Sequence, residues 1–224
     1  MSNIHTRIVL VGSPGAGKST QAEVISETLG VSVYSTGAIL RSMMYGKDRD
    51  AAQARRLIKG NLLADPEFMF HILKRAITDK DFILDGFPRN LPQLDVCMER
   101  LPFDIIIFLN VDRKEAYSRI LLRYTCNNCN LTYSKNEIQL KNPTCKNCGS
   151  KLTRRSDDQQ SKLVNKMHVY ENETRTMIET LKDKPYFVEI NGSDPKEVVS
   201  KKIFHAIEKQ MKAISKILNN QNCI

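Results

Sequence analysis

Short apolar runs bounded by turn residues recur along the chain. Residues 7–11 and 82–84 each lead into a glycine-containing turn, and residues 105–109 form an unbroken apolar run. Uninterrupted apolar runs of this length are typical of strands that are buried on both faces of a parallel sheet. Residues 31–34 and 186–190 are shorter, more ambiguous candidates. Together these runs predict five strands.

Helix signals lie between the apolar runs. Residues 20–29 end before Gly30, a typical C-terminal cap. Asp-Pro pairs at 65–66 and 194–195 place an N-cap before a proline in the first turn. The first pair opens a helix that runs to about residue 77. The second precedes a long helix with apolar residues at helical spacing, namely Val198, Ile203, Ile207, Met211 and Ile214. Alternating strands and helices predict an α/β fold with a central parallel five-stranded sheet and helices on both faces.

Residues 123–158 differ from the rest of the chain because they are polar and contain few large hydrophobic side chains. They carry two Cys-x-x-Cys pairs 15 residues apart, formed by Cys126, Cys129, Cys145 and Cys148. This spacing is typical of a zinc site in which two knuckles supply four thiolates. Degenerate and iron-loaded sites are the alternatives. Four sulfur ligands leave no open position on the metal, so the pattern predicts structural Zn²⁺ that replaces a hydrophobic core.

Composition narrows the class of protein. Hydrophobic residues make up 41% of the 224 residues and charged residues 26%, which excludes chain-wide disorder. No stretch approaches the ~20 apolar residues that span a bilayer, and the chain starts without a signal-peptide pattern. We therefore expect a cytoplasmic protein whose six cysteines are not a disulfide set, with Cys97 and Cys223 inert. The formal charge of +9 favours phosphate-bearing partners, although a merely solvated basic surface would give the same value.

The segment GSPGAGKS at residues 12–19 matches the pattern of a phosphate-binding loop. It lies between an expected strand and an expected helix, which is the context that this pattern requires. Glycines let backbone amides converge on phosphate oxygens, and the helix N-terminus adds partial positive charge. Lys18 would reach the outer phosphates, and Ser19 or Thr20 would approach Mg²⁺. Asp85, at the end of another strand, is placed to hold Mg²⁺ through its waters.

Four segments in order, GSPGAGKSTQA (12–22), STGAILR (35–41), DGFPRNLPQ (85–93) and RRSDD (154–158), closely resemble adenylate kinases of the bacterial long-lid type with a four-cysteine zinc site. The resemblance covers residues 7 to about 195. It implies a P-loop nucleoside monophosphate kinase fold with three parts: a core (1–34, 65–122 and 159–224), an AMP-binding helical insert (35–64) and a zinc-containing, ribbon-like lid (123–158). The reaction it implies is reversible Mg²⁺-dependent transfer from ATP to AMP, giving two ADP, in a monomer that binds neither membrane nor nucleic acid.

The resemblance also implies roles for matching residues. ATP would meet Gly15, Ala16, Gly17, Lys18, Ser19, Thr20, Arg119, Arg123, Thr132 and Tyr133. AMP would meet Thr36, Arg41, Leu62, Leu63, Gly86, Arg89, Gln93, Arg155 and Lys166. The residues expected to act in catalysis are Lys18, Asp85, Arg89, Arg123, Arg155 and Lys166.

Catalysis of this kind would depend on positioning and charge. Guanidinium groups pair bidentately with phosphate oxygens, and none of the four histidines falls in the matching segments. Three matching positions depart from the family pattern. Ser19 replaces the usual glycine and adds a hydroxyl, whereas Ala38 replaces an acidic residue and removes a hydrogen-bonding group. Lys166 replaces an arginine and loses its bidentate fork, so we expect weaker transition-state stabilisation there.

Two alternatives remain at this stage. The first is a kinase for another acceptor, UMP or CMP. Thr36 and Gln93, which match AMP-contacting positions of the family, favour AMP over these acceptors. The second is a nucleic-acid-binding protein with a zinc ribbon on a basic P-loop domain. Tyr133 is the one aromatic residue between the cysteines, so a platform for stacking bases is poorly supplied. For residues 196–224 we expect a packed amphipathic helix with a frayed end; a partner interface is the alternative.

Overall fold

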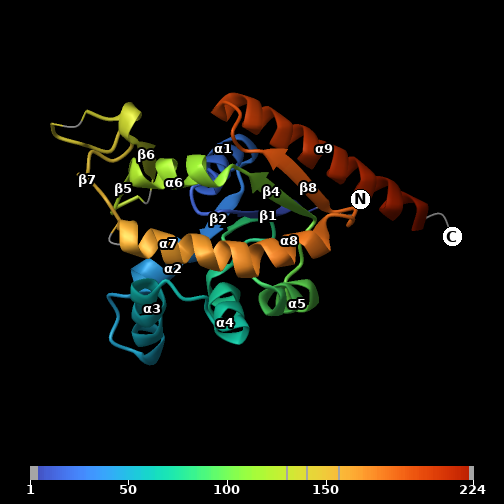
Figure 1. Cartoon of the computed structure of the whole chain (residues 1–224). Helices are drawn as coiled ribbons and strands as arrows, with labels where there is room; N and C mark the ends of the chain where they lie inside the picture. The colour runs from blue at the N-terminus through green and yellow to red at the C-terminus, as the bar shows by residue number, and fades with distance from the viewer. Residues whose placement is uncertain (1–4, 130, 140, 156, 222–224) are drawn as a thin grey trace.

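The computed structural model describes residues 5–129, 131–139, 141–155 and 157–221. Within them, five strands form one sheet in the order β2-β3-β1-β4-β8, and all the neighbouring strands are parallel (Figure 1). The strands are β1 (Arg7–Gly12), β2 (Ser32–Ser35), β3 (Phe82–Asp85), β4 (Ile105–Asn110) and β8 (Phe187–Asn191). The predicted central parallel sheet is therefore confirmed. The two ambiguous strands, β2 and β8, are real but lie one residue further along than expected.

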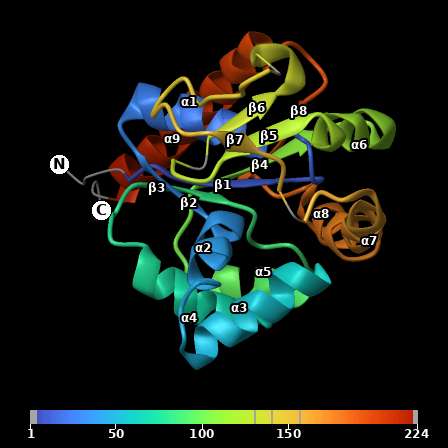
Figure 2. The same cartoon turned by 90° about the vertical axis from the view of Figure 1, so that its left-hand side faces the viewer.

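The central strands send alternate side chains to two separate cores. Ile8 and Leu10 of β1 pack into one core, whereas Val9 and Val11 pack into the other. Helices α1 (Lys18–Leu29), α6 (Arg113–Leu121), α7 (Gln160–Val169) and α9 (Lys196–Gln221) contribute to the first core. Helices α2 (Thr36–Met43), α3 (Arg49–Gly60), α4 (Pro66–Ala76), α5 (Leu91–Arg100) and α8 (Arg175–Leu181) contribute to the second. Helices thus cover both faces of the sheet, as Figures 1 and 2 show.

Two of the three capping signals act at helix ends as the sequence predicts. Helix α1 ends at Gly30, whose φ of 67° is in the left-handed region that favours glycine. The carboxylate of Asp65 accepts hydrogen bonds from the amides of Glu67 and Phe68 at the start of α4. Asp194 precedes α9, but its carboxylate accepts from Lys202 at 2.6 Å and from Asn191 at 3.1 Å. The long C-terminal helix is confirmed as far as residue 221, while Cys223 lies outside the described residues.

The polar, cysteine-rich stretch forms a second, smaller sheet. Within its described residues, β5 (Arg123–Cys126) pairs antiparallel with β6 (Thr132–Ser134) on one side and β7 (Leu152–Thr153) on the other. A 3₁₀ turn, η1 (Lys135–Glu137), follows β6. The buried apolar residues here are Cys126, Cys145 and Leu152, so the apolar core is very small. This lid projects beyond the central sheet (Figure 1).

A π-helical turn, η2 (Tyr170–Thr174), joins α7 to α8 and keeps the two in one continuous helical run. Turns of this kind are frequent at functional sites. Thr174 is buried there, and its hydroxyl donates a hydrogen bond of 2.7 Å to the carbonyl of Arg89. None of the described helices is both long and apolar enough to cross a membrane.

Candidate active site

One large cavity, of about 680 Å³, opens at the carboxyl ends of β1 and β3. The chain crosses the sheet in opposite directions after these neighbouring strands, and such switch points are where open α/β sheets bind ligands. Gly12 at the end of β1 and Asp85 at the end of β3 both line the cavity. The parallel sheet thus brings together two segments that lie more than 70 residues apart.

The loop between β1 and α1 forms one wall of the cavity. Gly15 has a φ of 82°, and a Cβ added there would lie 2.3 Å from the carbonyl oxygen of Ala116, so the loop can pack this closely only with glycine. The Lys18 ammonium donates to the carbonyls of Gly12 and Ser13, at 2.9 Å each. Burial lowers the pKa of Lys18 to about 8 against the opposing effect of Asp85. A phosphate beside it would raise this pKa again, because a nearby anion favours the charged form.

Ser19 and Asp85 meet at the foot of this loop. The Ser19 hydroxyl donates to Oδ2 of Asp85 at 2.8 Å, and the Asp85 side chain is buried. A hydroxyl and a carboxylate oxygen are hard ligands of the type that Mg²⁺ prefers. Sequence alone left Ser19 and Thr20 as equal candidates. The contact with Asp85 favours Ser19.

Cationic side chains from several elements line the cavity. Arg89 comes from the loop after β3, Arg119 from α6, and Arg123 and Arg155 from the lid sheet and the segment after it. Burial lowers the pKa of Arg89, and burial together with the neighbouring Arg123 and Arg41 lowers that of Arg155 to about 9. Like charges that lower one another's pKa form a site that an anion would stabilise.

Two buried carboxylates balance part of this charge. Asp158 accepts a bidentate pair of hydrogen bonds from Arg123, at 3.0 and 2.7 Å. Lys166 donates to Asp157 at 2.6 Å and to Asp158 at 3.0 Å. Burial opposes the ionisation of Asp157, but the ion pair with Lys166 outweighs it and lowers the pKa to about 2. In this conformation the Lys166 ammonium is therefore paired with two aspartates.

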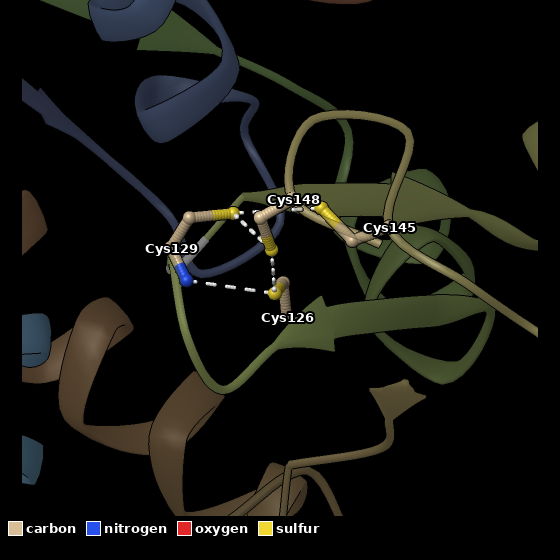
Figure 3. Close-up of side chains that lie close together, drawn as sticks. All are labelled: Cys126, Cys129, Cys145 and Cys148. Carbon is tan, nitrogen blue, oxygen red and sulfur yellow. Dashed lines mark hydrogen bonds between the residues drawn. The ribbon is translucent and has the colours of Figure 1, made fainter. Parts of the chain in front are cut away.

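The lid brings its four paired cysteines into one cluster (Figure 3). Their Sγ atoms all lie within 4.8 Å of one another, and the closest pairs are 3.4, 3.5 and 3.7 Å apart. Tetrahedral Zn²⁺ with Zn–S bonds of about 2.3 Å needs sulfur atoms at roughly this spacing. All four are free thiols. The donor set therefore fits a metal ion with four sulfur ligands.

Comparison with known proteins agrees with this geometry. A family model described as adenylate kinase matches residues 10–186. An adenylate kinase of Elusimicrobium minutum is 35% identical over 213 residues, which cover 91% of this chain and 99% of the relative. Adenylate kinases of Methanosarcina barkeri and Haloarcula marismortui are 32% and 31% identical, and the alignments cover 90% and 93% of this chain and 98% of each relative. The chain belongs to the adenylate kinase family. It is therefore a nucleoside monophosphate kinase.

All the residues expected to contact nucleotide in this adenylate kinase line the one cavity. Thr36 is buried and donates to the carbonyls of Asp85 and Gly86 at 3.2 and 3.0 Å. The Gln93 amide donates to the Ala64 carbonyl at 2.8 Å and accepts from the Arg89 amide at 2.9 Å. Both side chains are thus held by the protein itself. Leu62 and Leu63 line the cavity as well, and Leu62 is exposed.

Sequence reasoning missed several residues that line the same cavity, including Glu23, Asp157, Thr174, Asp194 and Lys196. Glu23 is the most unusual of them. Burial raises its pKa to about 7 against the opposing effect of Lys196. Glu23 lies one helical turn after Ser19 and therefore on the same face of α1. This spacing from the phosphate loop was the signal that could have found it.

Proposed function

We propose that this adenylate kinase family member transfers the terminal phosphoryl group of ATP to AMP, reversibly and with Mg²⁺, to give two ADP. The observation that carries the proposal is the shared cavity, which is lined by the phosphate loop, the DGFPR segment and cationic side chains from several elements. One site for two phosphorylated ligands needs this much positive charge, because the phosphates of donor and acceptor must approach each other.

In this proposal the loop from Gly15 to Thr20 holds the phosphates of ATP, and Lys18 exchanges its two carbonyl partners for phosphate oxygens. Arg119 and Arg123 close on the donor from the lid side, together with Thr132 and Tyr133 of β6. Asp85 and Ser19 hold Mg²⁺, which supplies charge neutralisation on the donor phosphates when bound. The lid cysteines hold a structural metal, and we assign it as Zn²⁺.

AMP occupies the side of the cavity lined by α2, by residues 62–63 and by the segment after β3. Thr36 and Gln93 face its base, while Arg41, Arg89 and Arg155 hold its phosphate. An oxygen of that phosphate attacks the terminal phosphorus of ATP, and the bond from this phosphorus to the bridging oxygen breaks. The charges balance without an additional proton, so no general base is required. Positioning alone is worth up to about 7–11 kcal/mol.

We further propose that residues 35–64 and 123–158 move as separate parts over the core formed by 1–34, 65–122 and 159–224. Closure would exclude water, which otherwise accepts the phosphoryl group. The enzyme would act as a monomer, without nucleic acid. Free thiols in a metal-binding arrangement suit a reducing compartment, so we place it in the cytoplasm.

A coupled assay that offers AMP, CMP, UMP and GMP separately with MgATP tests the proposal. We expect AMP to be the preferred acceptor by at least about tenfold in kcat/KM. Preference for UMP or CMP would reassign the acceptor. Absence of ADP from ATP plus AMP, together with a salt-sensitive shift of an oligonucleotide, would replace the enzyme with a nucleic-acid-binding protein.

A further inference from the structure

Arg155 is held differently from Arg123 and Lys166, its cationic neighbours in the cavity. Arg123 and Lys166 are each paired with buried carboxylates, but none of the ion pairs in the described part of the chain includes Arg155. Its side chain instead contacts two threonine hydroxyls. Nε donates to Oγ1 of Thr125 at 2.9 Å, and Nη2 donates to Oγ1 of Thr132 at 3.3 Å. Neutral acceptors orient the guanidinium without cancelling its charge, so the charge stays available for phosphate.

The two threonines are held in register by the lid sheet. Thr125 on β5 lies directly opposite Thr132 on β6, and side chains of directly paired residues point to the same face. Thr125 is buried, whereas Thr132 is half-buried and lines the cavity. The spacing between the two hydroxyls is therefore set by how β5 and β6 are joined.

The four cysteines of the cluster hold β5 and β6 together. The first knuckle starts in β5, where Cys126 is the last residue and directly follows Thr125, and Cys129 comes before β6. The amide of Cys126 donates to the carbonyl of Leu131 at 2.9 Å, which closes the hairpin beside Thr132. From the second knuckle, Sγ of Cys145 lies 3.2 Å from the hydroxyl of Tyr133, the residue after Thr132. Both knuckles thus contact the strands that carry the threonines, and Figure 3 shows the cysteines of both knuckles meeting.

We propose that Thr125 and Thr132 are positioning residues for Arg155, and that the four-cysteine cluster sets their spacing through the first knuckle and the Tyr133–Cys145 contact. The lid metal then has a second task besides stability, since it aligns one phosphate-binding guanidinium. The part of this inference that concerns phosphate rests on the proposed function. A misplacement of about 1 Å in such a group can cost about a hundredfold in rate.

The chain offers matched variants for the test. Thr→Val keeps the shape of the side chain and removes the hydroxyl. Thr153 on β7 lies directly opposite Thr125 on the other side of β5 from Thr132. Its hydroxyl, however, donates to the side-chain oxygen of Asn127 at 3.1 Å. T153V is therefore the control for T125V and T132V. In the same way, Tyr124 lies opposite Tyr133 across the hairpin, so Y124F is the control for Y133F.

The first experiment compares kcat and KM for ATP plus AMP in the Zn²⁺-loaded protein. We expect kcat to fall about tenfold for T125V or T132V and about a hundredfold for the double variant, with the KM values changing far less. T153V should keep wild-type kcat, and the corresponding Thr→Ser double variant, which restores both hydroxyls, should recover most of the kcat lost in T125V/T132V. An active wild type with an unchanged T125V/T132V variant would overturn the inference, as would an equal loss in T153V. Failure of the proposed function would appear differently, as a wild type that forms no ADP.

The second experiment measures, without catalytic turnover, how the hydrogen bond of Arg155 depends on the metal-loaded cysteine cluster. The ¹⁵N–¹H signal of Arg155 Nε, assigned with R155K, should be protected from exchange with water in the Zn²⁺-loaded protein because Thr125 accepts its hydrogen. Removing Zn²⁺ with a chelator under reducing conditions should abolish that protection, and Y133F should weaken it while Y124F does not. Protection that survives both T125V and Zn²⁺ removal would overturn the inference. In the rate assay, Y133F should add no loss to T125V/T132V, because both act on one arrangement.

Discussion

The pair of Asp157 and Lys166 provides a quantitative test of how the lid is attached to the core. Asp157 is 6% exposed, and its Oδ2 lies 2.6 Å from the Lys166 ammonium. Its pKa falls from 3.8 to about 2, because the nearby cation outweighs the cost of burial. A carboxylate whose folded-state pKa is lowered stabilises the fold above its unfolded pKa and loses this contribution as the pH falls through its folded pKa.

The size of the effect follows from the shift in pKa. One pKa unit corresponds to about 1.4 kcal/mol, so the shift to about 2 gives a contribution of about 2 kcal/mol at neutral pH. We therefore expect Asp157→Asn to lower the free energy of unfolding by about 2 kcal/mol at pH 7. The deficit should fall to about half near pH 3 and vanish below about pH 2.

Urea denaturation of both proteins at several pH values between about 7 and 3 measures this deficit. Glu179→Gln is the control, because Glu179 pairs with Lys182 while both side chains are about half exposed. That substitution should cost less than about 1 kcal/mol. Equal stability of Asp157→Asn and the wild type at pH 7 would contradict this prediction. A deficit that stays constant down to pH 3 refutes it as well, since the loss would then not come from ionisation.

Three further predictions concern the departures from the family pattern and the metal. Ser19→Ala should weaken the binding of Mg²⁺ to the ATP complex about tenfold, because Ser19 presents a hydroxyl beside Asp85. Calorimetry should show this loss together with an unchanged affinity for metal-free ATP. An unaltered affinity for Mg²⁺ would contradict the prediction. Lys166→Arg should raise kcat several-fold by adding a bidentate fork, and unchanged kcat and AMP KM would refute the prediction. Cys129→Ser should abolish stoichiometric binding of Zn²⁺ and lower the melting temperature of the lid. The reason is that three sulfur ligands remain in a segment with almost no apolar core. A full zinc content in this variant would contradict the assignment of the metal site.

Features encoded by local sequence could be predicted well. The strand cores, the glycine that ends α1 and the Asp65 cap depend on neighbouring residues, and the structure has each of them. The cysteine cluster was also readable, because the pattern of a metal site is set by spacing within two short knuckles. The ends of β2 and β8 were shifted by one residue, since short strands at the edges of a sheet have weak patterns.

Features that depend on long-range packing could not be predicted from the residues alone. The contact from Thr174 to the Arg89 carbonyl joins segments 85 residues apart through a π-helical turn that has no sequence signature. The pKa of Glu23 is raised by burial against the opposing effect of Lys196 on α9, and both depend on how the elements pack together. Likewise, the two threonines that contact Arg155 come together only when β5 pairs with β6. These are the parts of the site where the fold, and not the motif, decides the chemistry.

In the proposed function, donor and acceptor share one cavity, with their phosphates between the glycine loop and the cationic side chains. Calorimetry with two adenosines bridged by five phosphates tests this arrangement. We expect one molecule to bind per chain, more tightly than ATP or AMP, and both ATP and AMP binding to be lost when it is present. Binding no tighter than that of ATP, or AMP binding that persists beside it, would show that the two nucleotides do not share the cavity.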